Sequence, residues 1–499
     1  MPVAAIIAKE NKKDVSRQII NMLEAMSYNK NIFSIATDND FIKEKPIASL
    51  GLAETKMAIG RSGSFNRNKR FFAKYPTELG EELFLALDGY ILGSSKIPNE
   101  DKAHDDLIVD LIEEKMKNPE DLPEAVKSIL PDIHGAFTFA AMGRDSITVA
   151  RDIFGFEPLY WSEDNQCVAF ASERKALWKI GLKDLDLFPP GCVATVDGRT
   201  KTISRILSLA RPQIVDISLQ TAAERLAKML HKIFSRDYGG IKEVGELFSG
   251  GIDSSLVAKI LTDMGTKVTL YGTAVEEAYD IDAISRSASE LGCELRLRTL
   301  ALKEVENYLY KTIYSVEEAN IMKAGIGLPF YAAMETANGN GAKFIFSGQG
   351  ADEVFGGYSK YLRIVRSGYD KLNDELWKDI MQMSEVNLQR DGAIAMANNV
   401  DCYLPFLDLE LIYLAMSFPA RLKVKGPEDA MRTHVLRKAA EIVGLPESIV
   451  HMPKKAAQYS SGSDRAIRKL AAQEGKSPSE YVRHIFEKVL KEYHQQVSA

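Results

Sequence analysis

A loop of small residues with one carboxylate, residues 249–255, carries the clearest chemistry in this chain and reads Ser-Gly-Gly-Ile-Asp-Ser-Ser. A mostly apolar stretch, residues 244–248, precedes it, and the apolar pattern of residues 256–261 predicts a helix after it. In a strand–loop–helix unit, free backbone N–H groups and the positive end of the helix dipole bind phosphate. The glycines let the backbone approach the phosphate oxygens, and the serine hydroxyls add donors. The loop therefore predicts a phosphate site.

Asp253 does not fit a simple phosphate site, because a carboxylate repels phosphate unless a cation lies between them. We therefore predict that Asp253 binds Mg²⁺, which favours oxygen ligands. The loop lacks the Gly-x-x-x-x-Gly-Lys-Ser/Thr signature of P-loop NTPases, so it would be a different kind of phosphate loop. The alternative is a plain Gly-Ser turn in which Asp253 or Ser254 only caps the following helix.

A second loop, residues 347–358, repeats this arrangement after an apolar strand that ends at Phe346. It reads Ser-Gly-Gln-Gly-Ala-Asp-Glu-Val-Phe-Gly-Gly-Tyr. If the two loops follow neighbouring strands, Asp253 and Asp352 could share the Mg²⁺ that ATP requires. Taken alone, the loop would also fit a glycine-rich turn whose acids cap the next helix, but the pair of loops favours a nucleotide site.

The elements that must position these loops belong to the second half of the chain. From Leu219 on, helices alternate with short strands such as residues 267–271 and 343–346, which predicts an α/β domain with a parallel sheet. Ligands in such folds bind beyond the carboxyl ends of the strands, where residue 249 would lie. Residues 1–202 alternate short β-rich segments with turns, which predicts an α+β domain with stacked antiparallel sheets. We expect a linker at residues 203–217 and the second domain at residues 218–499.

Composition narrows the function classes. The chain has 499 residues, of which 45% are hydrophobic and 26% charged, so it predicts a globular protein of two or three domains. A net charge of −6 argues against nucleic acid or an anionic membrane as the main partner. No apolar run approaches the ~20 residues of a membrane span, and the N-terminus does not read as a secretion signal. The four cysteines lack paired spacing, so we expect a reduced, cytoplasmic protein without disulfides or zinc.

Three further stretches complete an ordered set of motifs: residues 400–408 contain Pro-Phe-Leu-Asp, residues 433–438 contain Leu-Arg, and residues 453–462 carry a lysine pair. The first loop resembles the pyrophosphate loop of N-type ATP pyrophosphatases. The whole set, over residues 215–465, resembles the asparagine synthetase family and its relatives, the β-lactam synthetases. The resemblance implies an adenine-nucleotide α-hydrolase-like fold that uses ATP and Mg²⁺. A substrate carboxylate would attack the α-phosphate, pyrophosphate would leave, and a nitrogen nucleophile would displace AMP.

The resemblance also implies roles for single residues. Asp253 and Asp352 would bind Mg²⁺. Lys454, with Lys455 as its rival, matches the catalytic lysine near the α-phosphate, and Arg437 matches the arginine of the Leu-Arg motif. Solvated lysines in a surface loop, and a salt bridge on a helix surface for Arg437, are the alternatives. The implied ATP-binding residues are Leu247, Ser249, Gly250, Gly251, Asp253, Ser254, Ser255, Gly272, Ser347 and Gly348.

Three departures from the family pattern concern the substrate. Gln349 stands at a catalytic position where asparagine synthetases have glutamate, so it can neither act as a base nor bind ammonium through charge. Tyr403 replaces an arginine, with Asp401 in place of a glutamate, and residues 291–295 lack the expected paired histidines. We expect these changes to surround the acyl-acceptor pocket, which leaves the acceptor open while the adenylating residues remain.

The first domain resembles a class II glutaminase, through residues 150–160, 170–177 and 189–191, which implies an Ntn-hydrolase-like αββα sandwich. Such a domain frees ammonia from glutamine with an N-terminal cysteine exposed after removal of Met1. Pro2 stands there in this chain and has no nucleophilic side chain. We therefore expect the domain to be a scaffold without glutaminase activity.

Neighbouring positions of the glutaminase pattern agree with this loss. Lys56 replaces an arginine that clamps the glutamine carboxylate, and an ammonium cannot copy a bidentate guanidinium. Asp88, before Gly89, replaces an asparagine that donates to the oxyanion, an interaction commonly worth about 10²–10³ in rate. Asp105 keeps the family acid, although an ordinary aspartate at a helix N-terminus would explain it equally well.

The sequence thus favours an asparagine synthetase-like ligase that uses ATP, free ammonia and, as the first choice, aspartate. An amine-dependent or ring-closing synthetase of the β-lactam type is the alternative, favoured by Gln349. A non-catalytic nucleotide-binding relative is a third interpretation. A homodimer is left open.

Overall fold

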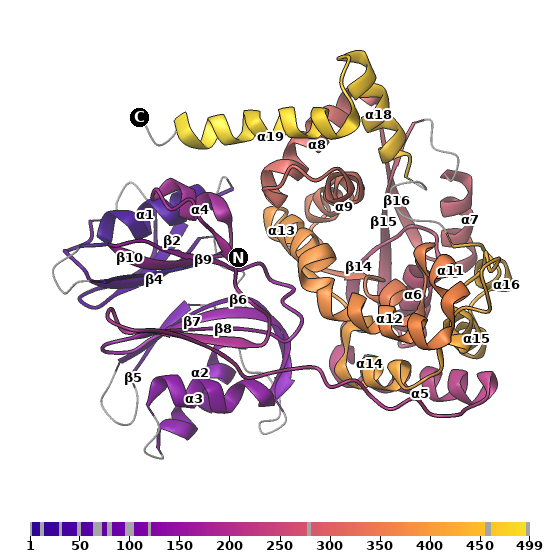
Figure 1. The fold of residues 1–499 in the computed structure, drawn as a ribbon, viewed down its shortest axis with the longest axis horizontal. Helices are drawn as coiled ribbons and strands as arrows, with labels where there is room; N and C mark the ends of the chain where they lie inside the picture. Colours follow the sequence, from indigo (N-terminus) through magenta and orange to yellow (C-terminus); the bar gives the residue numbers. More distant parts are fainter. Residues whose placement is uncertain are drawn as a thin grey trace. The chain divides into compact units, whose positions relative to one another are not determined.

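The computed structural model describes residues 2–9, 14–28, 32–46, 51–62, 72–76, 82–94, 104–117, 121–276, 281–454 and 461–495 (Figure 1). The chain divides into two compact units: Met1–Leu209 with Lys488–Ala499, and Ala210–Glu487. The division falls inside the linker expected at residues 203–217. It also groups the last residues, from Lys488, with the first unit, whereas the sequence boundaries placed them in the second.

The first unit contains two antiparallel sheets, with strand orders β11-β9-β10-β1-β4-β2-β3 and β13-β12-β8-β7-β6-β5. In Figure 1 the sheets lie face to face, with α1 and α4 beyond one and α2 and α3 beyond the other. The strands are β1 (Val3–Ala8), β2 (Ile32–Thr37), β3 (Phe41–Pro46), β4 (Met57–Ser62), β5 (Phe72–Pro76), β6 (Glu82–Ser94), β7 (Ile133–Met142), β8 (Ile147–Arg151), β9 (Tyr160–Glu163), β10 (Cys167–Ala171), β11 (Asp186–Leu187), β12 (Cys192–Val196) and β13 (Lys201–Arg205). The helices are α1 (Ser16–Ala25), α2 (His104–Met116), α3 (Leu122–Ile129), η2 (Leu130–Asp132) and α4 (Arg174–Lys179).

Strand β1 shows how the sequence builds these layers. Val3, Ala5 and Ile7 belong to the core between the two sheets, whereas Ala4 and Ile6 belong to the core under α1 and α4. Successive side chains of a strand point to opposite faces, so an uninterrupted apolar strand is buried on both sides. A third core joins the other sheet to α2 and α3. The expected αββα sandwich is confirmed.

The most distinctive motif of this unit, residues 150–160, has a structural explanation. The buried Arg151 guanidinium donates to the backbone carbonyls of Glu157, at 2.9 Å, and Gly155, at 2.7 Å. The Asp152 carboxylate accepts from the backbone N–H groups of Phe154 and Gly155, both at 2.8 Å. The neighbouring side chains of Arg151 and Asp152 therefore form hydrogen bonds with the backbone carbonyl and N–H groups of one turn, residues 154–157.

The second unit is built on five parallel strands in the order β16-β15-β14-β17-β18. These are β14 (Glu243–Leu247), β15 (Lys267–Val275), β16 (Glu294–Leu300), β17 (Phe344–Ser347) and β18 (Asp401–Tyr403). The helices are α5 (Leu219–Tyr238), α6 (Ile252–Asp263), α7 (Ile281–Leu291), α8 (Leu302–Val316), α9 (Ile321–Gly339), α10 (Ala351–Phe355), α11 (Lys360–Ile364), η3 (Val365–Ser367), α12 (Tyr369–Met383), η4 (Ser384–Leu388), α13 (Gln389–Ala397), η5 (Pro405–Leu407), α14 (Leu409–Met416), η6 (Ala420–Leu422), α15 (His434–Val443), α16 (Glu447–Val450) and α18 (Ser463–Gln473). The last helix, α19 (Pro478–Gln495), begins in this unit, and its residues from Lys488 are grouped with the first unit.

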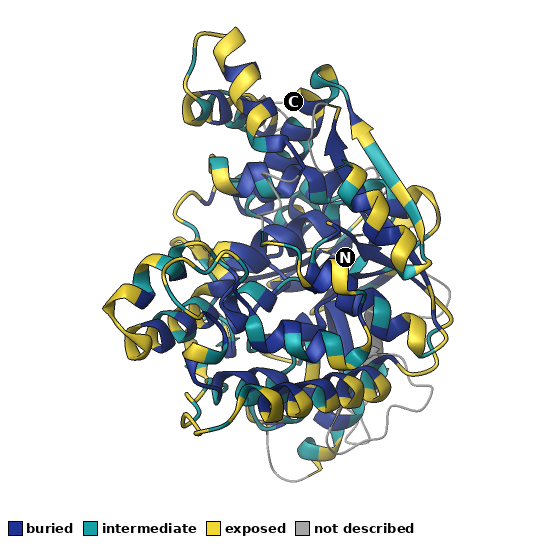
Figure 2. Ribbon diagram, turned by 90° about the vertical axis from the view of Figure 1, so that its right-hand side faces the viewer, coloured by how far each residue is buried: buried dark blue, intermediate teal, exposed yellow. Residues whose placement is uncertain are grey.

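Helices cover the parallel sheet, as the alternation of elements predicted. Figure 2 shows helices that are dark blue on one side and yellow on the other, which is the distribution of an amphipathic helix packed on a core. In α5 the buried residues recur at helical spacing: Ala222, Ala223, Leu226, Ala227, Leu230, Ile233, Phe234 and Tyr238. The apolar face of each helix therefore fixes its position over the sheet.

Register places the two candidate loops side by side. Strand β14 lies between β15 and β17, and Leu247 pairs with Ser347 across the sheet. Leu247 and Ser347 are the last residues of β14 and β17. Because the two strands run in the same direction and these residues are paired, both strands end at the same edge of the sheet. The loops after residues 247 and 347 must therefore emerge next to each other at the carboxyl edge.

One buried carboxyl stands out in the sheet itself. Glu246 on β14 is fully buried, and neither of its side-chain oxygens has a hydrogen-bond partner among the described residues. Burial raises the pKa of Glu246 well above its usual value. A carboxyl without hydrogen-bond partners is costly to bury in its charged form, so burial favours the protonated form of Glu246.

We predict that Glu246→Met stabilises the protein, by about 1–3 kcal/mol at pH 7, because it removes an unsatisfied buried polar group. Because the pKa of Glu246 is higher in the folded protein than in the unfolded chain, wild-type stability falls as pH rises above the ordinary pKa of glutamate. The variant should lose part of that slope. Urea unfolding at several pH values measures both effects, and equal slopes in the two proteins would contradict the assignment.

Candidate active site

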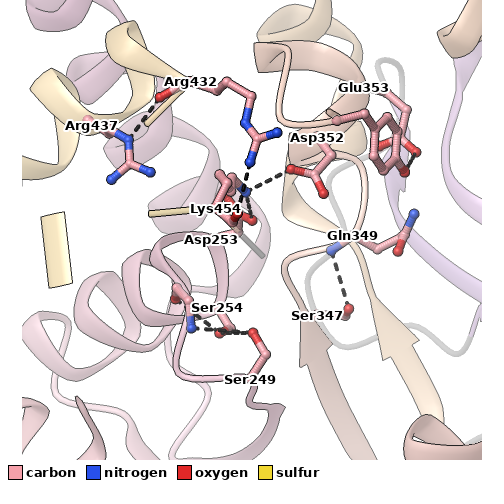
Figure 3. A network of polar contacts seen from close by, with 12 residues as sticks. Ser249, Asp253, Ser254, Ser347, Gln349, Asp352, Glu353, Arg432, Arg437 and Lys454 are labelled. Carbon is pink, nitrogen blue, oxygen red and sulfur yellow. Dashed lines mark hydrogen bonds and ion pairs between the residues drawn. The ribbon is translucent and has the colours of Figure 1, made fainter. Parts of the chain in front are cut away.

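Two carboxylates and one ammonium meet at the carboxyl edge of the parallel sheet (Figure 3). Asp253 lies in the first turn of α6, and Asp352 lies in the first turn of α10. Lys454 Nζ donates to Asp253 Oδ2 and lies 2.7 Å from Asp352 Oδ1. The exposed side-chain fractions are 9% for Lys454, 20% for Asp253 and 30% for Asp352, so the group is mostly shielded but open on one side.

The charges of this group stabilise one another. Burial raises the pKa of Asp253, and the nearby Asp352 carboxylate adds to this, while Lys454 opposes it. Burial disfavours the ammonium of Lys454, but attraction to the two carboxylates outweighs burial and raises the pKa of Lys454. Lys454 is therefore charged at neutral pH, and the ammonium holds two acidic groups together that would otherwise repel each other.

Glycines provide the space for the two carboxylates. A Cβ atom on Gly357 would lie 1.6 Å from Asp352 Oδ1, and a Cβ atom on Gly348 would lie 2.9 Å from the Cβ atom of Asp253. Gly357 does not adopt a positive φ, so it is needed for space and not for backbone conformation. Gly350 differs, because it begins α10 with a φ of +94°.

The first loop has the geometry of an anion site. Ser249 Oγ accepts from the backbone N–H of Gly251 at 3.3 Å, and Ser254 Oγ lies 3.5 Å from Ser249 Oγ. Gly250 adopts a φ of +74°, in the left-handed region that favours glycine. Two hydroxyls and the N-terminus of the twelve-residue helix α6 therefore face the same space. Ser255 is fully buried beneath the loop.

A cavity of about 420 Å³ contains the predicted site. Nine of the ten expected ATP-binding residues line it, and Ser255 is the exception. Asp352, Gln349 and Lys454 line it as well. The lining residues from the expected set are Leu247, Ser249, Gly250, Gly251, Asp253, Ser254, Gly272, Ser347 and Gly348.

Helix α9 contributes a wall of the cavity that the sequence analysis missed, through Pro329, Phe330 and Ala333. Proline inside a helix lacks the N–H that would bond to the carbonyl four residues earlier, here that of Gly325. The Ser463 hydroxyl supplies the missing donor to this carbonyl, at 2.6 Å. A proline within an apolar helical pattern was the available signal, although it does not reveal which side faces a ligand.

Next to Asp352 on α10, Glu353 belongs to a polar cluster with Tyr358 and Asn387. The Glu353 carboxylate accepts from the Tyr358 hydroxyl at 2.5 Å and from the Asn387 side chain. Burial raises the pKa of Glu353 to about 7, while the Tyr358 hydrogen bond lowers it. The tyrosine of the Phe-Gly-Gly-Tyr segment therefore holds the helix that carries Asp352.

Arg437 does not line the cavity. Its guanidinium donates to the backbone carbonyls of Met431 at 2.7 Å and Arg432 at 2.8 Å, and also to that of Val450. The surface salt bridge considered as an alternative is not what the structure contains, because Arg437 is buried. In the structure Arg437 connects the turn at residues 431–432 to the end of α16 at Val450. Direct catalysis by Arg437 remains a prediction.

The residues that depart from the family pattern, and that we expected around the acyl-acceptor pocket, do not all line the cavity. Of the three departures, only Gln349 lines the cavity. Tyr403 is buried, with its ring 5.5 Å from that of Tyr238 and 5.3 Å from that of Phe346. Residues 291–295 lie at the end of α7 and the start of β16, an edge strand of the sheet. The expectation that all three surround one pocket was wrong, because Tyr403, on β18, packs among aromatic rings, and β16 is the strand at the opposite edge of the sheet.

In the first unit, two of the expected glutaminase positions come together near the N-terminus. Asp88 is buried and accepts from the Ser172 hydroxyl at 3.2 Å, and the Val3 backbone N–H donates to the same hydroxyl at 2.9 Å. Pro2, which precedes Val3, is buried. Gly89 has a φ of +98°, and a Cβ atom there would lie 2.1 Å from the Ala136 carbonyl oxygen.

The remaining two glutaminase positions are less informative. Lys56 is exposed, and its backbone N–H donates to Asp38 at 3.1 Å. Asp105 belongs to α2, but its side chain lies outside the described residues. The roles of all five positions remain predictions.

The residues at the sheet edge fit Mg²⁺. Asp253 Oδ1 is buried and has no hydrogen-bond partner among the described residues, and the ammonium of Lys454 already occupies the position of a shared cation. Among the described residues, no group of three or more His, Cys, Asp or Glu side chains could hold a metal. Mg²⁺ needs only one or two protein carboxylates when phosphates and waters complete its coordination.

Comparison with known proteins identifies the family. The model of the asparagine synthase family matches residues 227–371 and 363–496, and that of a glutamine amidotransferase domain matches residues 96–179. A Methanocaldococcus jannaschii protein, provisionally named glutamine-hydrolyzing asparagine synthetase 1, is 31% identical over 98% of this chain and 99% of its own length. The chain belongs to the asparagine synthetase family. It is therefore an enzyme, an asparagine synthetase-like ligase.

More distant members of the family cover part of the chain. Asparagine synthetase B of Escherichia coli is 25% identical over 67% of this chain and 62% of its own length. Asparagine synthetase 1 of Saccharomyces cerevisiae is 25% identical over 64% of this chain and 62% of its own length. Both are named as glutamine-hydrolyzing enzymes. Among the described residues, no helix has the length and apolar character needed to span a membrane.

We predict that Gly357→Ala lowers activity at least tenfold, because the new methyl group collides with Asp352 Oδ1 and must displace this carboxylate. Gly339→Ala is the matched control, since Gly339 has open space around its Cβ position. Steady-state rates and thermal unfolding of both variants make the comparison. Equal activity of the two variants would show that Asp352 need not occupy its present position.

Proposed function

We propose that this ligase activates a carboxylate, with aspartate as the first choice, by transferring AMP to it from ATP. Pyrophosphate leaves in this step, and a nitrogen nucleophile then displaces AMP to form an amide. The observation that carries the proposal is the meeting of Asp253, Asp352 and Lys454 beside an anion-binding loop in one cavity. Such an arrangement suits a reaction that separates two phosphate groups.

Each part of the site has a role in this reaction. The Ser249 loop and the N-terminus of α6 would bind the leaving pyrophosphate and stabilise its developing charge, an effect commonly worth several kcal/mol. Asp253 and Asp352 would hold Mg²⁺, which neutralises phosphate charge when bound. Lys454 would leave the two carboxylates for the phosphate groups as the substrate binds, because one position cannot hold both cations.

Free ammonia is the proposed nitrogen source. Pro2 provides no thiol for glutamine hydrolysis, and the carboxylate of Asp88 would repel an oxyanion. The four cysteines are free, which agrees with a reducing compartment such as the cytoplasm.

A second candidate is a synthetase that uses an amine, or closes a ring within one substrate. Gln349 favours it, because this uncharged side chain lines the cavity where the family has a glutamate. The amide can accept and donate hydrogen bonds but cannot remove a proton from an attacking amine. An amine substrate would therefore need to arrive unprotonated or bring its own base.

We predict that the enzyme, supplied with ATP, Mg²⁺, aspartate and ammonium, forms AMP, pyrophosphate and asparagine in equal amounts. Glutamine in place of ammonium should give no asparagine. Product quantification by mass spectrometry, together with exchange of labelled pyrophosphate into ATP, measures each step. Pyrophosphate exchange in the presence of another carboxylate, but not in the presence of aspartate, would favour the second candidate. No pyrophosphate exchange with any carboxylate offered would contradict the proposal.

Lys454→Met should lower the rate of pyrophosphate exchange by about 10²–10³, because it removes a cation from the reacting phosphates. It should also leave two repelling carboxylates, so Mg²⁺ alone should raise the thermal midpoint of the variant more than that of the wild type. Lys455→Met is the matched control. If the control loses activity and Lys454→Met does not, the catalytic lysine has been assigned wrongly.

A further inference from the structure

A second cation, Arg432, lies next to the catalytic group (Figure 3). Arg432 is 7% exposed, and its Nη2 donates to the backbone carbonyl oxygen of Lys454 at 2.8 Å. Its Nε is buried and has no hydrogen-bond partner among the described residues. The charged form of this guanidinium is disfavoured by burial and favoured by Asp352 and Asp429, and the net pKa of Arg432 is lowered.

A strained turn holds Arg432 in this position. Arg432 and Thr433 both have a φ of +52°, in the left-handed region that non-glycine residues adopt only at an energetic cost. Such strain persists only where surrounding contacts determine the backbone. It therefore marks a segment whose geometry the rest of the fold enforces.

The contacts that enforce the turn can be named. Asp429 Oδ1 accepts from the backbone N–H groups of Met431 at 3.2 Å and Arg432 at 3.0 Å. Asp429 Oδ2 accepts from the Lys425 backbone N–H at 2.8 Å and lies 2.8 Å from His434 Nε2. From the other side, Arg437 Nε donates to the Arg432 carbonyl. The backbone of residue 432 is thus fixed at both its N–H and its carbonyl.

We propose that Arg432 is a positioning residue for Lys454 in the adenylation step, an inference that rests on the proposed function. Its guanidinium fixes the backbone of Lys454 at the cavity, so the lysine side chain can move between the carboxylates and the phosphates while its base stays in place. It also keeps a positive charge beside Asp352 after Lys454 has moved. A planar guanidinium suits this role, because it binds a carbonyl and an anion with different N–H groups.

Chemical labelling of Lys454 tests the positioning directly and needs no turnover. We expect a pulse of acetic anhydride to label Lys454 slowly in the wild type, because its side chain is 9% exposed and its ammonium contacts two carboxylates. In Arg432→Met the label should enter Lys454 at least about threefold faster, relative to the exposed Lys267 as internal reference. Arg468→Met, which removes an exposed pair with Asp464 on α18, is the matched control and should change nothing. Peptide mass spectrometry separates Lys454 from Lys455.

Kinetics provide the second readout. A shift of the lysine by about 1 Å is expected to cost up to 100-fold in rate, so kcat for pyrophosphate exchange in Arg432→Met should fall at least tenfold while KM for ATP changes less than threefold. Arg432→Lys should recover part of kcat, since it keeps the charge. If the methionine variant does not fold, Arg432→Gln replaces it under the same criteria.

The two proposals fail in different ways. Unchanged labelling of Lys454 in the Arg432 variant would overturn the positioning role, whatever the activity. A wild-type enzyme without pyrophosphate exchange would overturn the proposed function, while faster labelling in the variant would still support the grip of Arg432 on Lys454. A variant in which only KM rises would also overturn the positioning role, because it would assign Arg432 to ground-state binding of ATP.

Discussion

The ion group of Asp253, Lys454 and Asp352 is the interaction on which the second unit of this enzyme depends. Lys454 is 201 residues from Asp253 along the chain, yet its ammonium contacts both carboxylates. Two acids at neighbouring strand ends repel each other in a partly buried site unless a cation joins them. The ammonium of Lys454 supplies this cation from the chain itself. Under the proposed function, the same arrangement would supply two carboxylates to a metal ion and a positive charge to phosphate.

The fold provides this group through register and space. Parallel pairing of Leu247 with Ser347 brings two loops to one edge, and Gly348 and Gly357 leave room for the carboxylates. A turn held by Asp429 then places Arg432 on the carbonyl of Lys454. Each contribution is a short-range constraint, but together they join four distant segments. Family membership and site geometry therefore support the same chemistry.

Local patterns predicted the parts of the site that local chemistry determines. Small residues with one acid after an apolar strand were sufficient to propose Asp253 and Asp352, and the alternation of elements predicted the parallel sheet. Residues whose role depends on tertiary packing were not predictable in this way. Arg432 has no motif of its own, and Pro329 reads only as a proline within a helix. Tyr403 was assigned to a pocket, whereas its ring packs against those of Tyr238 and Phe346.

Under the proposed function, the cation between the two carboxylates exchanges when the substrate binds. The most direct measurement is a crystal structure with Mg²⁺ and an ATP analogue that cannot release pyrophosphate. We predict a metal ion about 2.0–2.1 Å from oxygens of both Asp253 and Asp352, with Lys454 Nζ moved onto a phosphate oxygen. A metal ion that contacts neither carboxylate, or a Lys454 that still bridges them with the nucleotide bound, would contradict the account.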